Sequence, residues 1–200
     1  MTSLAGIDLQ VDAWGADVVY SGTQKCLSSL PGIAPITFSP DAVDAITSRT
    51  HKVQSWFLDM NLIMGYWGEG TKRAYHHTAP VNAIYALHES LLMLQEEGLQ
   101  GSFARHRQNH VALATGLAEL GIELAVAEAW RLPQLNAVRI PQGADDAEIR
   151  ARLLTDFNLE VGAGLSELAG QQWRIGLMGS SSNAVNINRC LSAFEAVLAS

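Results

Sequence analysis

The sequence predicts an α/β fold in two parts that meet near residue 100, and three observations support this. Two short apolar runs, at residues 16–20 and 33–38, enclose a loop rich in Gly, Ser and Thr. An amphipathic helix is predicted over residues 80–97. From there, helical and strand patterns alternate to the last residue, which indicates a compact α+β unit.

The two apolar runs read as short buried strands. The first stops at a Ser-Gly-Thr-Gln sequence, and the second lies between Pro31-Gly32 and Pro40. Residues 21–32 contain too many turn-forming residues for a regular element. We therefore expect a loop that is presented by two strands.

Helical segments follow in the first part. Residues 41–49 and the aromatic segment 56–67 are predicted to be helical, and residues 68–73 form a polar loop. Pro80 stands near the start of the next predicted helix and Gly98 just after its end. Its apolar stripe consists of Val81, Ile84, Leu87, Leu91 and Leu94.

The second part alternates between the apolar spacing of helices and that of strands. Apolar spacing predicts helices and strands in this order: helix 102–120, strands 122–127 and 136–140, helix 145–157, strands near 159–161 and 173–177, and helix 182–198.

Composition and charge exclude several functional classes. The chain is 48% hydrophobic with a mean hydropathy of +0.09, as in a soluble globular protein. A net charge of −7 disfavours nucleic acid and anionic membranes as partners, because both require clustered Lys and Arg. No apolar run is long enough to span a bilayer, and the first residues do not resemble a signal peptide.

The cysteines and histidines indicate no metal. Cys26 and Cys190 are far apart and form no CxxC motif, so neither a zinc site nor a disulfide framework is expected. This favours a reducing, cytoplasmic location. Adjacent histidines such as His76 and His77 rarely bind the same ion, and no third ligand has suitable spacing, so we do not expect a metal site there.

Lys25 is the candidate for covalent chemistry. It is one of three lysines, with Lys52 and Lys72, and it lies in the loop directly after the first strand. An amine in an electropositive site loses its proton readily and can form an imine with a carbonyl. From spacing alone, a solvated loop lysine remains an open alternative.

Five sequence blocks resemble class V, fold-type I pyridoxal-phosphate aminotransferases of the alanine/serine–glyoxylate branch. These blocks are WGAD at 14–17, VVYSGTQKCLSSLPG at 18–32, YHHTAP at 75–80, RLP at 131–133 and RIGLMG at 174–179. The resemblance covers essentially the whole chain. It implies that residues 1–100 are the C-terminal portion of the large cofactor-binding domain, with helices on a mostly parallel sheet. Residues 101–200 would then be the small C-terminal α+β domain.

The same resemblance implies roles for individual residues. Lys25 matches the lysine that holds pyridoxal 5'-phosphate as an imine and then moves the α-proton of the substrate. Gln24 matches a phosphate-contacting residue. Tyr75 and Thr78 match residues that reach across a homodimer interface to the phosphate in the other subunit. Arg174 matches the arginine that binds the substrate carboxylate through both oxygens. A structural ion pair is the alternative for Arg174.

The resemblance also implies what to look for upstream. The carboxylate partner of the pyridine nitrogen, the Gly-rich phosphate cup and the ring-stacking residue of the family match positions before Met1. We therefore expect the C-terminal half of an enzyme that transfers an amino group from serine or alanine to glyoxylate. Alternatives are a fragment without activity of its own, and relatives that act on ureidoglycine, aminophosphonate or pyridoxamine. A cysteine desulfurase is disfavoured, because only Cys190 follows the lysine loop and it lies in a predicted helix.

Overall fold

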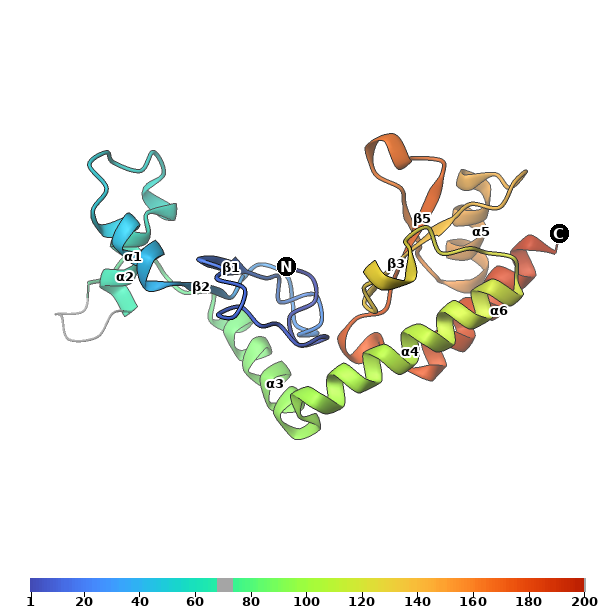
Figure 1. Cartoon of the computed structure of the whole chain (residues 1–200), viewed down its shortest axis with the longest axis horizontal. Coiled ribbons are helices and arrows are strands. Elements are labelled where there is room, and N and C mark those ends of the chain that lie inside the picture. Colours follow the sequence, from blue (N-terminus) through green and yellow to red (C-terminus); the bar gives the residue numbers. More distant parts are fainter. Residues whose placement is uncertain (68–73, 200) are drawn as a thin grey trace.

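The computed structural model describes residues 1–67 and 74–199 of the chain. Strands β1 (Val18–Tyr20) and β2 (Ile36–Phe38) pair antiparallel, with Val19 opposite Thr37. A strand forms within each predicted run, but Val18, Tyr20 and Ile36 are exposed, so the expectation that both strands are buried is wrong. Residues 21–35 connect the two strands as the expected loop. Figure 1 shows the β1–β2 pair between the α1–α2 region at one end of the molecule and the sheet of β3 and β5 at the other.

Two short helices follow β2. Helix α1 (Pro40–Thr47) is capped by the Ser39 side chain, which accepts a hydrogen bond from the Ala42 amide. The aromatic segment divides into a 3₁₀ turn, η1 (Trp56–Leu58), and helix α2 (Met60–Trp67). The predicted helical segments are confirmed, with this break at Asp59. The polar loop predicted at residues 68–73, with Lys72, lies outside the described residues.

Two long helices form a V at the centre of the molecule (Figure 1). Helix α3 (Val81–Glu97) and helix α4 (Leu99–Glu119) are separated only by Gly98, whose φ of 77° is open to glycine at little cost. Helix α4 starts a few residues before the predicted position. Gly98 reverses the chain so sharply that no connecting loop is needed.

The C-terminal part is built on a three-stranded sheet. Strands β3 (Leu135–Arg139), β5 (Gln172–Gly176) and β4 (Gly162–Ala163) pair antiparallel in that order. Helix α6 (Ala184–Leu198) packs against both α4 and α5 (Asp146–Phe157). The remaining 3₁₀ turns are η2 (Glu128–Trp130), η3 (Ser166–Leu168) and η4 (Gly179–Ser181).

Some sequence expectations differ from the structure. The strand predicted at residues 122–127 is only an isolated bridge between Leu124 and Val138, because the chain leaves the sheet and enters η2. The strand predicted near 159–161 pairs slightly later, as β4. Every strand pairing in the described part of the chain is antiparallel, so the parallel pairing expected for the large domain is not formed between these strands.

Two separate clusters form the buried core. The larger cluster lies wholly within residues 113–198 and is centred on Trp173 and Phe194, which are fully buried. The smaller one consists of Ala5, Cys26 and Leu27, with partly buried neighbours from α3 and from Met178. Among the described residues, no helix is long and apolar enough to cross a membrane.

Candidate active site

The lysine loop folds around a buried threonine. Thr23 is fully buried, and its hydroxyl oxygen lies 2.5 Å from the Leu30 carbonyl oxygen and 3.1 Å from that of Ile33. The Ser29 amide donates to the Thr23 carbonyl over 2.9 Å. These bonds close the loop on itself. Gln24 is left exposed and Lys25 half-buried at its outer turn.

Lys25 and Gln24 together border two open hollows. One, of about 350 Å³, is also lined by four serines, Ser28, Ser29, Ser180 and Ser181. The other, of about 430 Å³, lies on the side of the first residues and β1. The first hollow matters most, because residues of the C-terminal part line it as well. The lysine loop and the segment after β5 therefore face each other across it.

Arg174 lies on β5, the strand that leads into this hollow. Its Nε donates to the Ala163 carbonyl oxygen over 2.8 Å, which orients the guanidinium group. None of the ion pairs among the described residues involves Arg174. Gly176, two residues further on the same face of β5, borders the hollow beside Lys25. Arg174 therefore keeps guanidinium donors for another partner, and the structural ion pair considered as its alternative is not formed here.

Tyr75 and Thr78 form a pair of their own. Their hydroxyl oxygens lie 2.5 Å apart, and both residues are exposed, Tyr75 to 73%. Neither residue lines the two hollows that Lys25 borders. The structure thus brings Lys25, Gln24 and the Arg174 strand together, but not this pair. Its predicted role across a dimer interface stays a prediction.

The cysteines are poorly placed for nucleophilic chemistry. Cys26 is buried, its sulfur lies 3.4 Å from the Thr2 carbonyl oxygen, and burial raises the pKa of its thiol. Cys190 is buried in α6, where burial raises the pKa of its thiol to about 11. A thiolate is the reactive form of cysteine, so both environments suppress reactivity.

The histidine pair is held by neighbouring groups. The His76 ring stacks on Trp56, with centroids 4.1 Å apart, and its Nε2 lies 3.1 Å from the Trp56 carbonyl oxygen. Its Nδ1 lies 2.7 Å from Nδ1 of His77. These contacts give both residues a packing role.

The residues around Lys25 fit one side of a phosphorylated aldehyde cofactor. The lysine amine could hold the aldehyde carbon. Hydroxyl and amide groups beside it could donate to phosphate oxygens, and the Ser29 hydroxyl is buried without a hydrogen-bond partner in the described part of the chain. Among the described residues, no Asp or Glu lines either hollow. The carboxylate that a pyridine nitrogen requires is therefore not supplied by these surroundings.

Sequence reasoning missed the serines that line this hollow. The sequence places Ser28 and Ser29 only in the turn-rich loop, and Ser180 and Ser181 directly before the last predicted helix. The two segments are separated by about 150 positions in the sequence, and no local pattern shows that they face each other. The Ser180 amide in fact donates to the Ser28 hydroxyl over 2.8 Å.

Comparison with known proteins identifies relatives over nearly the whole chain. The alanine–glyoxylate aminotransferase of Felis catus is 38% identical over 99% of this chain, and the (S)-ureidoglycine–glyoxylate transaminase of Bacillus subtilis is 34% identical over 99%. The solved alanine–glyoxylate aminotransferase of Nostoc sp. superposes on 98% of the chain with a TM-score of 0.95 and 45% identity. No protein-family model matches the chain.

The chain spans about half the length of these relatives. It covers 48% of the Felis protein, 51% of the Bacillus protein and 52% of the Nostoc structure. The pyridoxamine–pyruvate aminotransferase of Mesorhizobium loti, at 22% identity and a TM-score of 0.88, shares the fold. The predicted fold class is therefore confirmed, while the assignment of activity has to rest on the site.

Proposed function

The chain is a homologue of the class V, fold-type I pyridoxal-phosphate aminotransferases and corresponds to their C-terminal half, and from this premise we propose its function. The proposed reaction is transfer of an amino group from serine or alanine to glyoxylate. The chain would act in it as the C-terminal portion of the enzyme. Its partners would be a small amino acid, a 2-oxo acid and a second subunit in a cytoplasmic homodimer.

One observation carries the proposal. Lys25 and the strand of Arg174 meet at the same hollow, although 149 positions separate them in the sequence. An amine beside the hollow, and a guanidinium without an ion pair among the described residues on the strand that borders it, suit a substrate that has both an amino group and a carboxylate.

Each residue has a defined part in this proposal. Bound pyridoxal phosphate would supply an aldehyde and an electron-withdrawing ring. Lys25 would hold the aldehyde carbon and then take the proton from the substrate α-carbon and return it to the product. Gln24 would donate to the phosphate, and Tyr75 with Thr78 would do so from the partner subunit. Arg174 would grip the substrate carboxylate and orient the α-carbon toward Lys25.

The alternatives differ in the substrate or in whether the chain is active on its own. The ureidoglycine relative has nearly the same identity as the alanine relatives, so ureidoglycine as amino donor is the second candidate. Aminophosphonate and pyridoxamine follow, as in the sequence analysis. The described residues that line the two hollows include no carboxylate, and this supports the further alternative that the isolated chain is inactive.

Glycine formation tests the proposal. The chain is incubated with pyridoxal phosphate, glyoxylate and serine or alanine, with the Lys25→Ala variant as control. We expect glycine with the natural chain only. Arg174→Ala should raise KM for the amino acid by roughly 30-fold, because a charge-assisted, two-point contact is lost. Equal glycine formation by Lys25→Ala would overturn the proposal, and no glycine from any sample would favour the inactive fragment.

A further inference from the structure

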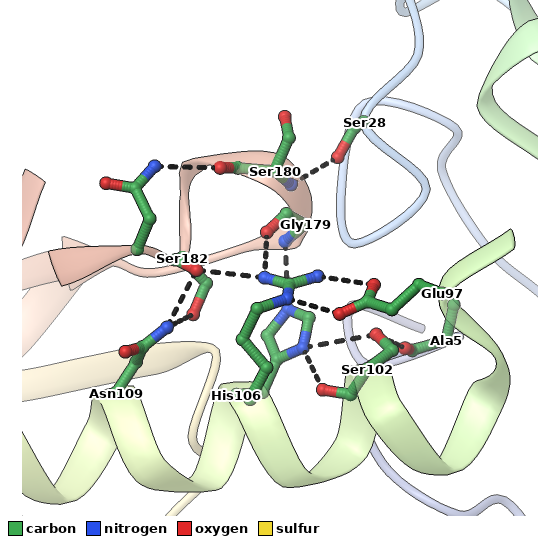
Figure 2. Close-up of polar contacts among 11 residues, drawn as sticks. Ala5, Ser28, Glu97, Ser102, His106, Asn109, Gly179, Ser180 and Ser182 are labelled. Atoms are coloured by element: carbon green, nitrogen blue, oxygen red, sulfur yellow. Dashed lines mark hydrogen bonds and ion pairs between the residues drawn. The ribbon is translucent and has the colours of Figure 1, made fainter. Parts of the chain in front are cut away.

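The segment after β5 is fastened to two other parts of the molecule. On one side, Arg105 of α4 donates through Nη1 to the carbonyl oxygens of Gly179 and Ser182, over 2.7 and 2.9 Å. On the other side, the Ser180 amide donates to the Ser28 hydroxyl of the lysine loop. Figure 2 shows Gly179 between His106 and Ser28. The segment is thus a bridge between helix α4 and the lysine loop.

Gly179 allows the closest approach in this bridge. Its φ is 54°, and a β-carbon there would lie 1.9 Å from the Ser28 hydroxyl oxygen and 2.8 Å from the Cys26 carbonyl oxygen. Any side chain would therefore push the lysine loop away. Cys26 follows Lys25 directly, and the Ser28 amide donates to the Lys25 carbonyl over 2.9 Å. The backbone at Gly179 consequently rests against the residues that hold Lys25.

His106 is the central buried residue of this junction. It is fully buried, and its Nε2 lies 2.9 Å from the Gly179 amide nitrogen. Because an amide can only donate, Nε2 must be the unprotonated nitrogen. The proton is then on Nδ1, which donates to the Ser102 carbonyl oxygen over 2.7 Å. Burial lowers the pKa of His106, which keeps the ring in this neutral form.

The junction extends across the bend between the two long helices. Arg105 also pairs with Glu97, the last residue of α3, with 2.8 Å between Nη2 and Oε2. Ser102, one turn before His106, donates through its hydroxyl to the Ala5 carbonyl oxygen over 2.7 Å. One face of α4 therefore ties α3, the first residues and the segment after β5 to one another, as the contacts in Figure 2 show.

We propose that Arg105 and His106 are positioning residues that hold Gly179 against the lysine loop and thereby set the distance between Lys25 and Arg174. This inference rests on the proposed function, since it concerns the same two residues. Arg174 lies five positions before Gly179, on a strand whose other end is fixed in the larger core. Movement of Gly179 would change the position of the lysine relative to the guanidinium.

Helix α4 provides a matched control for His106. His110 lies one turn further on, is also buried, and its Nδ1 lies 2.6 Å from the Asn136 side-chain oxygen on β3. Its contact stays within the C-terminal part. His106→Leu and His110→Leu each remove one buried imidazole and its hydrogen bonds from the same helix, so they should cost similar stability. Only the first removes a contact with the bridge.

Hydrogen exchange of the whole chain, followed by peptide mass spectrometry, tests the inference without cofactor. In His106→Leu, amides of residues 21–30 and 179–182 should exchange roughly tenfold faster than in the natural chain. His110→Leu should leave residues 21–30 unchanged. His106→Gln should restore most of the protection, because its amide oxygen can accept from the Gly179 amide. If His106→Leu does not fold, Ser28→Ala replaces it and should accelerate exchange in both segments.

The outcomes separate this inference from the proposed function. Unchanged exchange at residues 21–30 in His106→Leu, or equal acceleration in His110→Leu, would overturn it. Failure of His106→Gln to restore protection would also overturn it. If the cofactor is trapped on Lys25 but exchange at residues 21–30 does not respond to His106→Leu, the proposed function holds and this inference fails. If exchange responds but no cofactor is trapped, this inference holds and the proposed function fails.

Discussion

The two parts of the molecule bury their apolar side chains to very different extents. Residues 113–198 enclose a core of fifteen buried residues, among them Trp173 and Phe194. The described residues before the Gly98 bend contribute three, and they expose many large apolar side chains, including Trp14, Tyr20 and Trp56. Exposed apolar surface of this extent is typical of a face that packs against another chain or segment.

Helix α3 forms as its apolar pattern predicts but is only partly buried. Its apolar stripe predicts a buried face, yet Val81, Ile84 and Leu91 are exposed, and only Leu87 and Leu94 pack against the small core. The helix forms with the predicted bounds even so. The local apolar pattern is therefore sufficient to form helix α3. Burial of its apolar face requires a packing surface that the described residues before Gly98 do not provide.

The largest effect expected from this comparison concerns the tryptophans. Trp173→Ala should lower the free energy of unfolding by about 3–5 kcal/mol, because it opens a cavity against Phe194 and removes a hydrogen bond to Asp146. Trp14→Ala, where 59% of the residue is exposed, should change it by about 0.5 kcal/mol or less. Urea unfolding followed by circular dichroism measures both. Equal losses would show that the two regions unfold as one equally packed unit.

The two cysteines provide a comparison of local opening. In the Cys190→Ala variant, the remaining Cys26 should react with a thiol reagent roughly tenfold faster than Cys190 does in Cys26→Ala. The smaller core around Cys26 opens more readily, and the thiol pKa of Cys190 is raised to about 11 by burial. The rates are followed by absorbance in native buffer. Faster reaction of Cys190 would reverse the order of stability inferred for the two regions.

The smallest effect concerns the acid sensitivity of the C-terminal part. The Arg150 guanidinium and the Trp173 indole both donate to Asp146, and the pKa of that carboxyl is lowered from 3.8, mainly by Arg150. A lowered folded-state pKa stabilises the fold above the ordinary value and loses this effect as the pH falls through the lowered one. Asp146→Asn should cost about 1 kcal/mol at pH 7 and progressively less below pH 3.8. A cost independent of pH in unfolding titrations would contradict this assignment.

Sequence pattern predicted the elements better than it predicted their partners. Strands β1, β3 and β5 and the long helices follow from apolar periodicity, because each pattern repeats within the element itself. The strand expected at 122–127 failed, since pairing with β3 lasts for a single bridge. The expectation that Arg174 and Lys25 serve one site came from the family resemblance, and the structure brings the β5 strand of Arg174, through Gly176, to the hollow of Lys25. The physical basis of this arrangement, the contact of Ser180 with Ser28, joins segments that no local pattern relates.

One local signal for the junction was present in the sequence but was not used. Ser102, His106 and His110 recur every four residues on the face of α4 that continues into Leu113 and Leu117. Polar side chains in line with an apolar stripe indicate buried hydrogen bonds, and all three residues are buried in the structure. The pattern could have predicted that α4 binds something polar, but not that its partner is the segment after β5.

The most direct test of the proposed site is to trap the cofactor on this chain. Pyridoxal phosphate is added to the purified protein, the mixture is reduced with borohydride, and the labelled peptide is mapped. The account predicts label on Lys25 and none above background on Lys52 or Lys72, because Lys25 lies beside serine residues in a hollow shared with the Arg174 strand. Label spread equally over the three lysines, or absent from Lys25, would contradict it.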